Sequence, residues 1–313
     1  MICCKSPVKL GSCSWPGPGR VFSVFSFSML AVTLLRAGEP VQLTNDGKFK
    51  LSPSFLAGGA EVVFSVHDVP NRVTLTRLKL EDRARTRVFP TLATHQFDGV
   101  YSPDSRYLCF SRSSTSPQLE LVIVDTREKT EVVHSPAGGG RSSVRCPSFA
   151  PDGTRIAFTQ SGAGGHQVAT VDIRAMDLKL LTDSPGINKD PDYSPDGKHI
   201  VFSSSRTGDL EVFVMSADGS DQRRLSQSRG LDMHPAWSPD GERIAFTSMR
   251  DGNYEIYVMS ADGSGATNVT RNPERDDFAT WSPDGERLLL VSERRGHFDL
   301  YLIDAPAVRE RED

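Results

Sequence analysis

Trp237-Ser238-Pro239-Asp240-Gly241 is the stretch that decides the fold, because the same pattern returns along the chain. Ser-Pro-Asp-Gly occurs again at 194–197 and at 282–285, so that neighbouring copies are 44 residues apart. Variants stand at 150–153 and 102–105, and a degraded copy, Leu-Ala-Gly-Gly at 56–59, brings the number of repeats to six. A fixed period of this length indicates a repeat architecture.

Each copy of the tetrad predicts a turn between two short strands. Pro presets φ at the second turn position, Ser caps the first, and Gly relieves the last. An aromatic residue precedes each turn and an apolar run such as Ile244-Ala245-Phe246 follows it. Asp-Gly pairs at 218–219 and 262–263 signal a further tight hairpin in the same period. We therefore expect four antiparallel strands per repeat, and no window shows a sustained helical pattern.

Six repeats of four strands predict an all-β fold, a six-bladed β-propeller over residues 39–304, with no second domain. The last repeat ends after its third strand, Leu300-Tyr301-Leu302-Ile303, and a polar tail follows at 305–313. Val41-Gln42-Leu43-Thr44 is similar to the fourth strands of other repeats. We expect this N-terminal strand to complete the last blade, since that closure pairs both free sheet edges.

The first 38 residues differ from the rest of the chain. Val21–Leu35 is an apolar run that follows Arg20, with the length of a signal-peptide core and too short to span a bilayer. We expect a signal peptide or leader at 1–38 and a periplasmic or secreted mature protein that is not an integral membrane protein apart from that leader. An uncleaved anchor and a misplaced start are the alternatives.

The charge and the cysteine content argue against several classes of partner and of site. The formal net charge is −4, and the leader carries four basic residues and no acid, so the mature chain is more acidic still. Such a chain has no general attraction for nucleic acid or anionic lipid. Outside the leader only Cys109 and Cys146 remain, too few for a disulfide framework and without metal-ligand spacing.

With the repeats laid out, the chain resembles the TolB-like propeller family. The resemblance rests on the Trp-Ser-Pro-Asp-Gly core and on a later run, Arg-x-Gly-x-x-(Glu/Asp), that starts at Arg206, Arg250 and Arg294. It implies a propeller in the cell envelope that binds proteins, although TolB has an extra α/β domain before its propeller and this chain is expected to lack it. The same repeat occurs in propellers of peptidases and oligogalacturonate lyases.

Several catalytic patterns are missing from the sequence. Neither Gly-x-Ser-x-Gly nor His-Glu-x-x-His occurs, which argues against a serine hydrolase or a zinc peptidase. The Asp of each turn repeats around the predicted ring, so these carboxylates cannot converge on one ligand and are expected to be structural. Arg206, Arg250 and Arg294 are each expected to form a salt bridge with the acid five residues later.

The better candidates lie where the repeats differ. One position in the predicted first strand of five repeats, near the expected mouth of the central channel, carries Asp98, Cys146, Asp190, His234 and Phe278. Such a set could hold a transition metal or serve a lyase-like, carbohydrate-active enzyme. The favoured interpretation is a polar channel mouth with no metal and no cofactor.

The loops between repeats are a second candidate surface, because they vary while the frame repeats. Arg271, Arg275 and Asp277 represent this surface. The sequence thus predicts a monomeric, non-catalytic, exported scaffold for a protein or peptide of unknown identity. The alternatives are a carbohydrate-active propeller enzyme and an accessory subunit that filters substrates for a peptidase.

Overall fold

The computed structural model describes residues 38–69, 71–113, 118–137, 142–162 and 164–306. These residues form 24 β-strands, and no helix occurs among them. Residues 1–37 of the predicted leader and the end of the polar tail, 307–313, lie outside the described residues. Within the described part, no helix is long and apolar enough to cross a membrane.

Hydrogen bonding groups the strands into five sheets rather than the six separate sheets expected. Four sheets have four strands each, and one has eight. The four-stranded sheets consist of β2(Lys50–Phe55), β3(Glu61–Val69), β4(Arg72–Lys79) and β5(Arg85–Arg87); β14(Asn188–Tyr193), β15(His199–Ser204), β16(Glu211–Ser216) and β17(Arg223–Arg224); β18(Asp232–Trp237), β19(Arg243–Ser248), β20(Glu255–Ser260) and β21(Thr267–Asn268); and β22(Asp276–Trp281), β23(Arg287–Arg294), β24(His297–Asp304) and β1(Val41–Gln42).

The eight-stranded sheet contains two antiparallel units that are joined by a single pair of hydrogen-bonded strand residues. The first unit is β6(Gln96–Tyr101), β7(Tyr107–Ser113), β8(Leu119–Asp125) and β9(Thr130–His134). The second is β10(Ser143–Phe149), β11(Arg155–Gly162), β12(Gly165–Asp172) and β13(Leu178–Leu180). One parallel pair, Ser143 with Leu119, joins β10 to β8 and merges the two units into one sheet.

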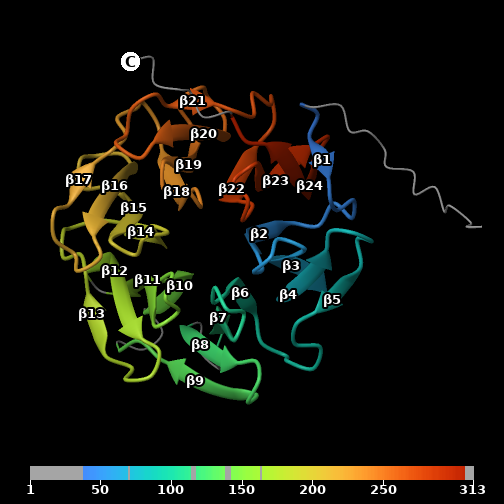
Figure 1. Ribbon diagram of the computed structural model, residues 1–313, viewed down its shortest axis with the longest axis vertical. Coiled ribbons are helices and arrows are strands. Elements are labelled where there is room, and N and C mark those ends of the chain that lie inside the picture. Colours follow the sequence, from blue (N-terminus) through green and yellow to red (C-terminus); the bar gives the residue numbers. More distant parts are fainter. Residues whose placement is uncertain (1–37, 70, 114–117, 138–141, 163, 307–313) are drawn as a thin grey trace, which may run out of the picture. The chain divides into compact units, whose positions relative to one another are not determined.

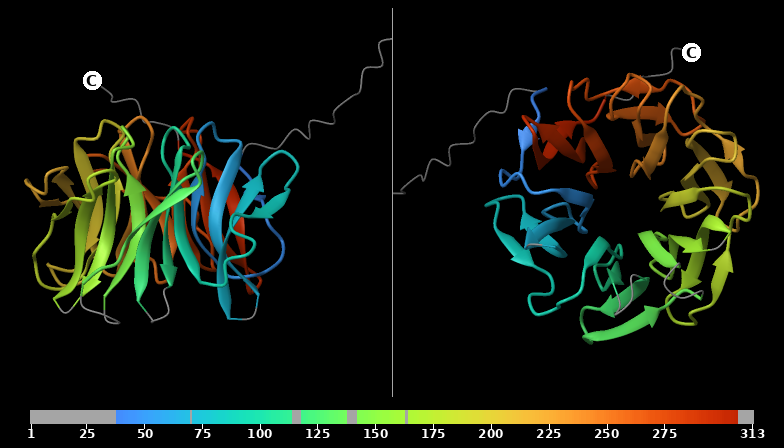
Figure 2. Two further views of the ribbon diagram at one scale, coloured as in Figure 1. Left: turned by 90° about the horizontal axis from the view of Figure 1, so that it is seen from below. Right: turned by 180° about the vertical axis from the view of Figure 1, so that it is seen from behind.

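The strand units surround a central axis as a β-propeller (Figure 1). The first strands contact one another in the order β2, β6, β10, β14, β18 and β22, and β22 contacts β2. The outermost strands, among them β5, β9, β13 and β17, lie at the periphery in Figure 1. Figure 2 shows from the side that the strands run roughly along the axis. Positions in the first strands therefore face the centre.

Apolar side chains of the middle strands pack neighbouring units together. Ile244 and Phe246 of β19, for example, are fully buried in a cluster that includes Val212 and Leu225 of the neighbouring β14–β17 unit. Cys109 is likewise a buried apolar side chain, and burial raises the pKa of its thiol well above the usual value. The apolar side chains of the middle strands are thus largely buried between sheets, whereas Val132, Val133, Leu178 and Leu180 in outer strands remain exposed.

The Ser-Pro-Asp-Gly turns have the predicted geometry. In the turn at 238–241, the Gly241 amide donates to the Ser238 carbonyl at 2.9 Å, and Gly241 has a φ of 73°. The Asp240 carboxylate accepts hydrogen bonds from the Ser238 hydroxyl and the Glu242 amide at 2.5 and 2.9 Å. Ser105 takes the left-handed place of glycine in its own turn, with a φ of 56°. The turn carboxylates are therefore engaged locally.

The N-terminal strand pairs with the last strand of the chain. Val41 and Gln42 of β1 lie antiparallel to Leu302 and Tyr301 of β24. The Leu300 amide donates to the Thr44 hydroxyl at 3.0 Å. Ile256 makes the same contact with Thr270 at 3.0 Å, and Val212 with Ser226 at 2.9 Å. Residues 41–44 thus take the place that a fourth strand has in other units.

The prediction that Arg206, Arg250 and Arg294 each form a salt bridge with the acid five residues later is wrong. Arg250 pairs with Asp232 at 3.0 Å, and Arg206 donates to the side-chain oxygen of Asn188 at 3.0 Å. Arg294 donates to the Ser292 hydroxyl. The acids bind the fourth strand instead: Glu211 accepts from the Ser226 hydroxyl at 2.7 Å. Arg206 and Arg250 therefore support the first strands of their units, and the acids bind residues at the fourth-strand position, as Glu255 does with Thr270 and Asp299 with Thr44.

Candidate functional site

Every first strand is interrupted by a β-bulge at the same position. The register shifts there in all six strand pairs. The bulged residue has left-handed backbone although none is glycine. Residues held in this conformation cost of order 1–3 kcal/mol each and gather at functional sites. The six are Ser52 (φ 44°), Asp98 (54°), Cys146 (53°), Asp190 (55°), His234 (51°) and Phe278 (56°); we call them the inner ring.

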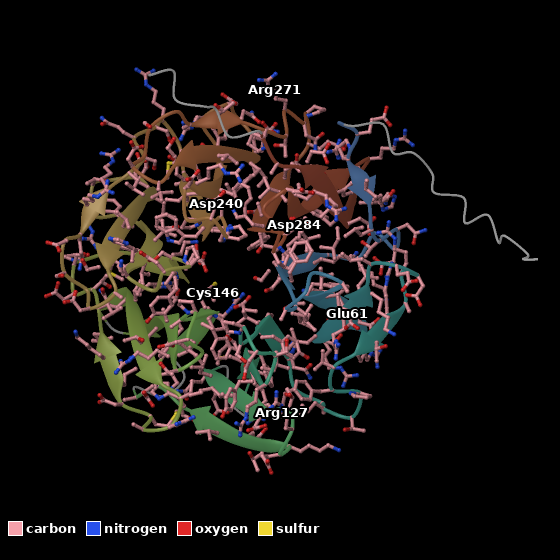
Figure 3. The ribbon with its side chains drawn as sticks, in the orientation of Figure 1. Glu61, Arg127, Cys146, Asp240, Arg271 and Asp284 are labelled. Atoms are coloured by element: carbon pink, nitrogen blue, oxygen red, sulfur yellow. The ribbon has the colours of Figure 1, made fainter. Side chains whose placement is uncertain are left out.

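Side-chain contacts run from one inner-ring residue to the next. The Ser52 hydroxyl donates to Asp98 at 2.8 Å, and the Cys146 amide donates to the same carboxylate at 3.1 Å. Nε2 of His234 lies 3.6 Å from Asp190 Oδ2, and the imidazole stacks on the Phe278 ring with 4.3 Å between centroids. Figure 3 labels Cys146 at the inner edge of β10. The structure therefore brings all five predicted channel residues together.

Asp98 is buried and held by a cation. Arg145 donates to its carboxylate through Nε at 2.5 Å and through Nη2 at 3.2 Å, and the guanidinium lies 4.8 Å above the Phe97 ring. Burial by itself would raise the pKa of Asp98, but Arg145 outweighs it and lowers that pKa below the usual value. Asp98 is thus a carboxylate whose charge is already neutralised within the site.

His234 is oriented by a second buried carboxylate. Its Nδ1 lies 2.9 Å from Oδ1 of Asp277, which also accepts from the Thr247 hydroxyl at 2.8 Å. Arg275 donates to the other oxygen at 2.6 Å. Burial opposes the charge on Asp277, yet His234 and Arg275 hold its pKa well below the usual range. Because Nδ1 is engaged by Asp277, Nε2 is the nitrogen that faces Asp190.

Cys146 lies between the carboxylates of Asp98 and Asp190. Burial raises the pKa of its thiol well above the usual value, and the two neighbouring carboxylates raise it further. Lys189 Nζ lies 3.1 Å from Asp190 Oδ2 and compensates that charge. The thiol is therefore protonated at neutral pH, which makes it a poor nucleophile. In the described part of the chain, no group of three or more His, Cys, Asp or Glu residues is placed to hold a metal ion.

A central cavity of about 160 Å³ is lined by the inner ring and the two residues that follow each member. Asp192, one of these, accepts hydrogen bonds from the Ser148 hydroxyl and the Trp237 amide, both at 2.8 Å. It thereby links three neighbouring units. Burial raises the pKa of Asp192 to about 6. A cavity of this size has room for a few waters or one side chain of a partner.

The predicted loop surface is not a single surface. Arg271 is exposed, and Figure 3 labels it at the periphery. Arg275 lies 4.2 Å above the Tyr254 ring and is partly covered. Asp277, placed in a loop by the sequence analysis, belongs to β22 and is 1% exposed. It belongs to the inner-ring network because β22 begins two residues earlier in the loop than the turn pattern indicates.

Sequence reasoning missed Ser52, the sixth member of the inner ring. Proline directly follows four of the six members, at 53, 147, 191 and 235. Proline in a strand interior is typical of bulges, because it cannot donate to the ladder. That recurring proline was the available signal for Ser52. Asp192 and Asp277 had no such signal, since only the register places their side chains.

Residues 94–230 and 224–311 match the family model of the TolB β-propeller domain. The chain belongs to this family. Among solved structures, the one assigned to TolB of Agrobacterium tumefaciens is 21% identical, with a TM-score of 0.67 over 85% of this chain and 93% of that chain. TolB of Acinetobacter baumannii is 22% identical, with a TM-score of 0.64 over 78% of this chain and 63% of that chain. No curated protein matches the sequence.

Enzymes share the fold as well. An oligogalacturonate lyase in complex with manganese is 16% identical, with a TM-score of 0.57 over 86% of this chain and 93% of that chain. A gluconolactonase of Xanthomonas campestris is 16% identical, with a TM-score of 0.63 over 86% of this chain and 90% of that chain. At such identities the likeness concerns the fold alone.

Proposed function

We propose that this TolB-family chain is an exported, non-catalytic scaffold that binds a protein or peptide at the inner ring. The observation that carries the proposal is the ring itself. A position kept only for folding repeats the same residue, as the Asp of the turns does, whereas the ring holds five residue types at six equivalent places. A strained backbone that aims varied side chains at one cavity is the arrangement of a recognition site.

The ring's electrostatics favour binding over catalysis. Asp98 is compensated by Arg145, Asp190 by Lys189 and Asp277 by Arg275. The Cys146 thiol has a raised pKa and is not activated. The preorganised polar groups can hydrogen bond to a side chain or chain end of a partner, which fits the protein partner that TolB membership suggests.

Two serines with left-handed backbone test the proposed site. Ser52→Trp fills the ring, whereas Ser105→Trp places the same side chain in the turn between β6 and β7. In affinity capture from an envelope extract, the wild type and Ser105→Trp should retain the same partners, and Ser52→Trp should lose them. Retention by Ser52→Trp of everything the wild type captures would exclude the inner ring as the binding site.

We further infer six blades, with the eight-stranded sheet counted as two. A single residue pair joins its halves, and each half supplies one inner-ring residue, as every other sheet does. The pairing of β1 with β24 supports closure of the ring by the N-terminal strand. Export in a cleaved, monomeric form belongs to the same proposal. N-terminal sequencing of the mature protein should find a start near residue 38.

A carbohydrate-active enzyme is the second candidate, favoured by the His234 and Asp277 pair. A carboxylate at Nδ1 orients the imidazole so that Nε2, 3.6 Å from Asp190 Oδ2, is the nitrogen that could act as a general base in the cavity. Assays with oligogalacturonate and with gluconolactone decide between the candidates. Turnover that is abolished in His234→Gln would establish the enzyme, and the scaffold proposal expects none.

A further inference from the structure

A second cavity lies between the β2–β5 and β6–β9 units, away from the inner ring. Its volume is about 810 Å³, against about 160 Å³ for the central cavity. One wall comes from β4, β5 and the loop that follows, and the other from β7, β8, β9 and the hairpin between β8 and β9. Figure 3 labels Glu61 on the β2–β5 side and Arg127 on the hairpin. We call this cavity the outer groove.

The floor of the outer groove is apolar. Val88 and Phe89 contribute from the first wall, and Leu108 and Val124 from the second. Phe89 packs against the buried Phe110 ring with 5.0 Å between centroids, which holds it in place. An aliphatic or aromatic side chain seated here would be removed from water.

The rim of the outer groove carries more cations than acids. Five basic side chains line it, and the three acidic ones, Glu61, Asp125 and Glu131, are each paired with an arginine. Lys79 and Lys129 are exposed and have no acidic partner within 4 Å among the described residues. The five bases are Arg77, Lys79, Arg87, Arg112 and Lys129. This surplus stands out in a chain whose formal net charge is negative.

A corresponding cavity elsewhere in the ring has the opposite character. It lies between the β10–β13 and β14–β17 units and measures about 550 Å³. Four aspartates line it, against Arg155 and Lys179. A hollow between units therefore does not by itself require basic residues. The charge of the outer groove is a property of its own sequence.

We propose that the outer groove binds an extended acidic segment of a partner protein. An apolar side chain of that segment covers Phe89, while its carboxylates pair with Lys79 and Lys129. A glycan fits this groove less well, because the apolar floor side chains Val88, Phe89, Leu108 and Val124 offer no hydrogen bonds to sugar hydroxyls. The proposal does not rest on the inner ring and stands whether or not that site binds a partner.

The probe for the test is a fluorescent peptide of alternating glutamate and leucine, titrated by anisotropy onto the full chain. Loss of two ion pairs with charge reversal in Lys79→Glu/Lys129→Glu should weaken binding at least about tenfold. Lys179→Glu, the matched control in the acidic cavity, should leave the affinity unchanged. A peptide with serine in place of leucine should bind several-fold more weakly, which tests the floor without altering the protein.

Three results would overturn the proposal. The first is equal affinity for the double variant and the wild type, both shown to be folded by thermal unfolding. The second is an equal loss of affinity in Lys179→Glu, which would indicate general charge attraction. The third is tighter binding of polygalacturonate than of the peptide, lost in the double variant, which would make the groove a glycan site.

Discussion

The ammonium group of Lys50 lies 3.0 Å from the carboxylate of Asp299, a residue 249 positions away in the sequence. The Lys50 side chain is 0% exposed, and it also donates to Asp46 and to the Phe298 carbonyl. Thr44 donates to the same Asp299 oxygen at 2.6 Å. This buried cluster joins the beginning of the described chain to its last strand.

Lys50→Met should destabilise the protein strongly. It leaves Asp299 buried without its cation, and removal of one partner of a buried pair typically costs about 3–5 kcal/mol. Denaturant unfolding measures the effect. Lys50→Met/Asp299→Leu should recover part of the loss, because both charges are then removed. A single variant within about 0.5 kcal/mol of wild type would show that the cluster does not contribute.

Deletion of residues 40–45 should make the chain self-associate. The deletion removes β1 and exposes the edge of β24, whose unpaired amides and carbonyls can pair with another chain. Analytical ultracentrifugation should detect oligomers, and the melting temperature should fall. A stable monomer after this deletion would refute closure by the N-terminal strand.

Asp192 and Asp276 should make stability fall as the pH rises from about 5 to 7. Burial raises the pKa values of both carboxyl groups to about 6, above the usual value of 3.8. Between these values the folded state binds more protons than the unfolded state, so each group favours folding at low pH by up to about 3 kcal/mol. Urea unfolding between pH 4.5 and 7.5 tests this. Asp192→Asn should make the profile shallower, and an unchanged profile would contradict the assignment.

Asp277→Lys and Arg271→Glu should behave differently. Asp277 is buried beneath His234, so reversal of its charge should lower the melting temperature by more than about 6 °C. Arg271 is exposed at the periphery, and its reversal should leave the melting temperature within about 1 °C. Differential scanning calorimetry compares the two. Equal, small effects would mean that Asp277 does not hold the ring.

Glycine and serine in the turns provide a reciprocal test. Gly241→Ala places a side chain at a φ of 73° and should cost about 1–2 kcal/mol. Ser105→Gly relieves the equivalent position and should stabilise by about 0.5–1 kcal/mol. Thermal unfolding of both variants is sufficient. Destabilisation by Ser105→Gly would show that the Ser105 side chain has a role beyond the turn.

The fold could be predicted because the turn chemistry repeats. Ser-Pro-Asp-Gly recurs with an aromatic before it and an apolar strand after it, so period and strand count follow. The match of residues 41–44 to a fourth strand also came from local pattern. The sequence does not reveal that Ser143 and Leu119 join two units into one sheet, because a single backbone pair requires no particular side chains.

The inner ring was predicted in part. Comparison of equivalent positions in the repeats predicts five of its members. It does not predict Ser52, because the turn of that repeat is degraded. The repeat pattern places Asp277 in a loop, because the sequence does not fix the residue at which a strand begins. The partners of Arg206, Arg250 and Arg294 depend on register across three strands. Spacing along one segment could not reveal them.

The bulges in the first strands distinguish the repeated strand backbone from the inner-ring side chains that project from it. The same left-handed bulge carries five different residue types at six equivalent positions, so one backbone conformation serves all of them. Ser52, Asp98, Cys146, Asp190, His234 and Phe278 therefore give six equivalent backbone positions a different chemical surface in almost every unit. Under the proposed function, relatives with the same turns and different residues at these six positions should bind different partners.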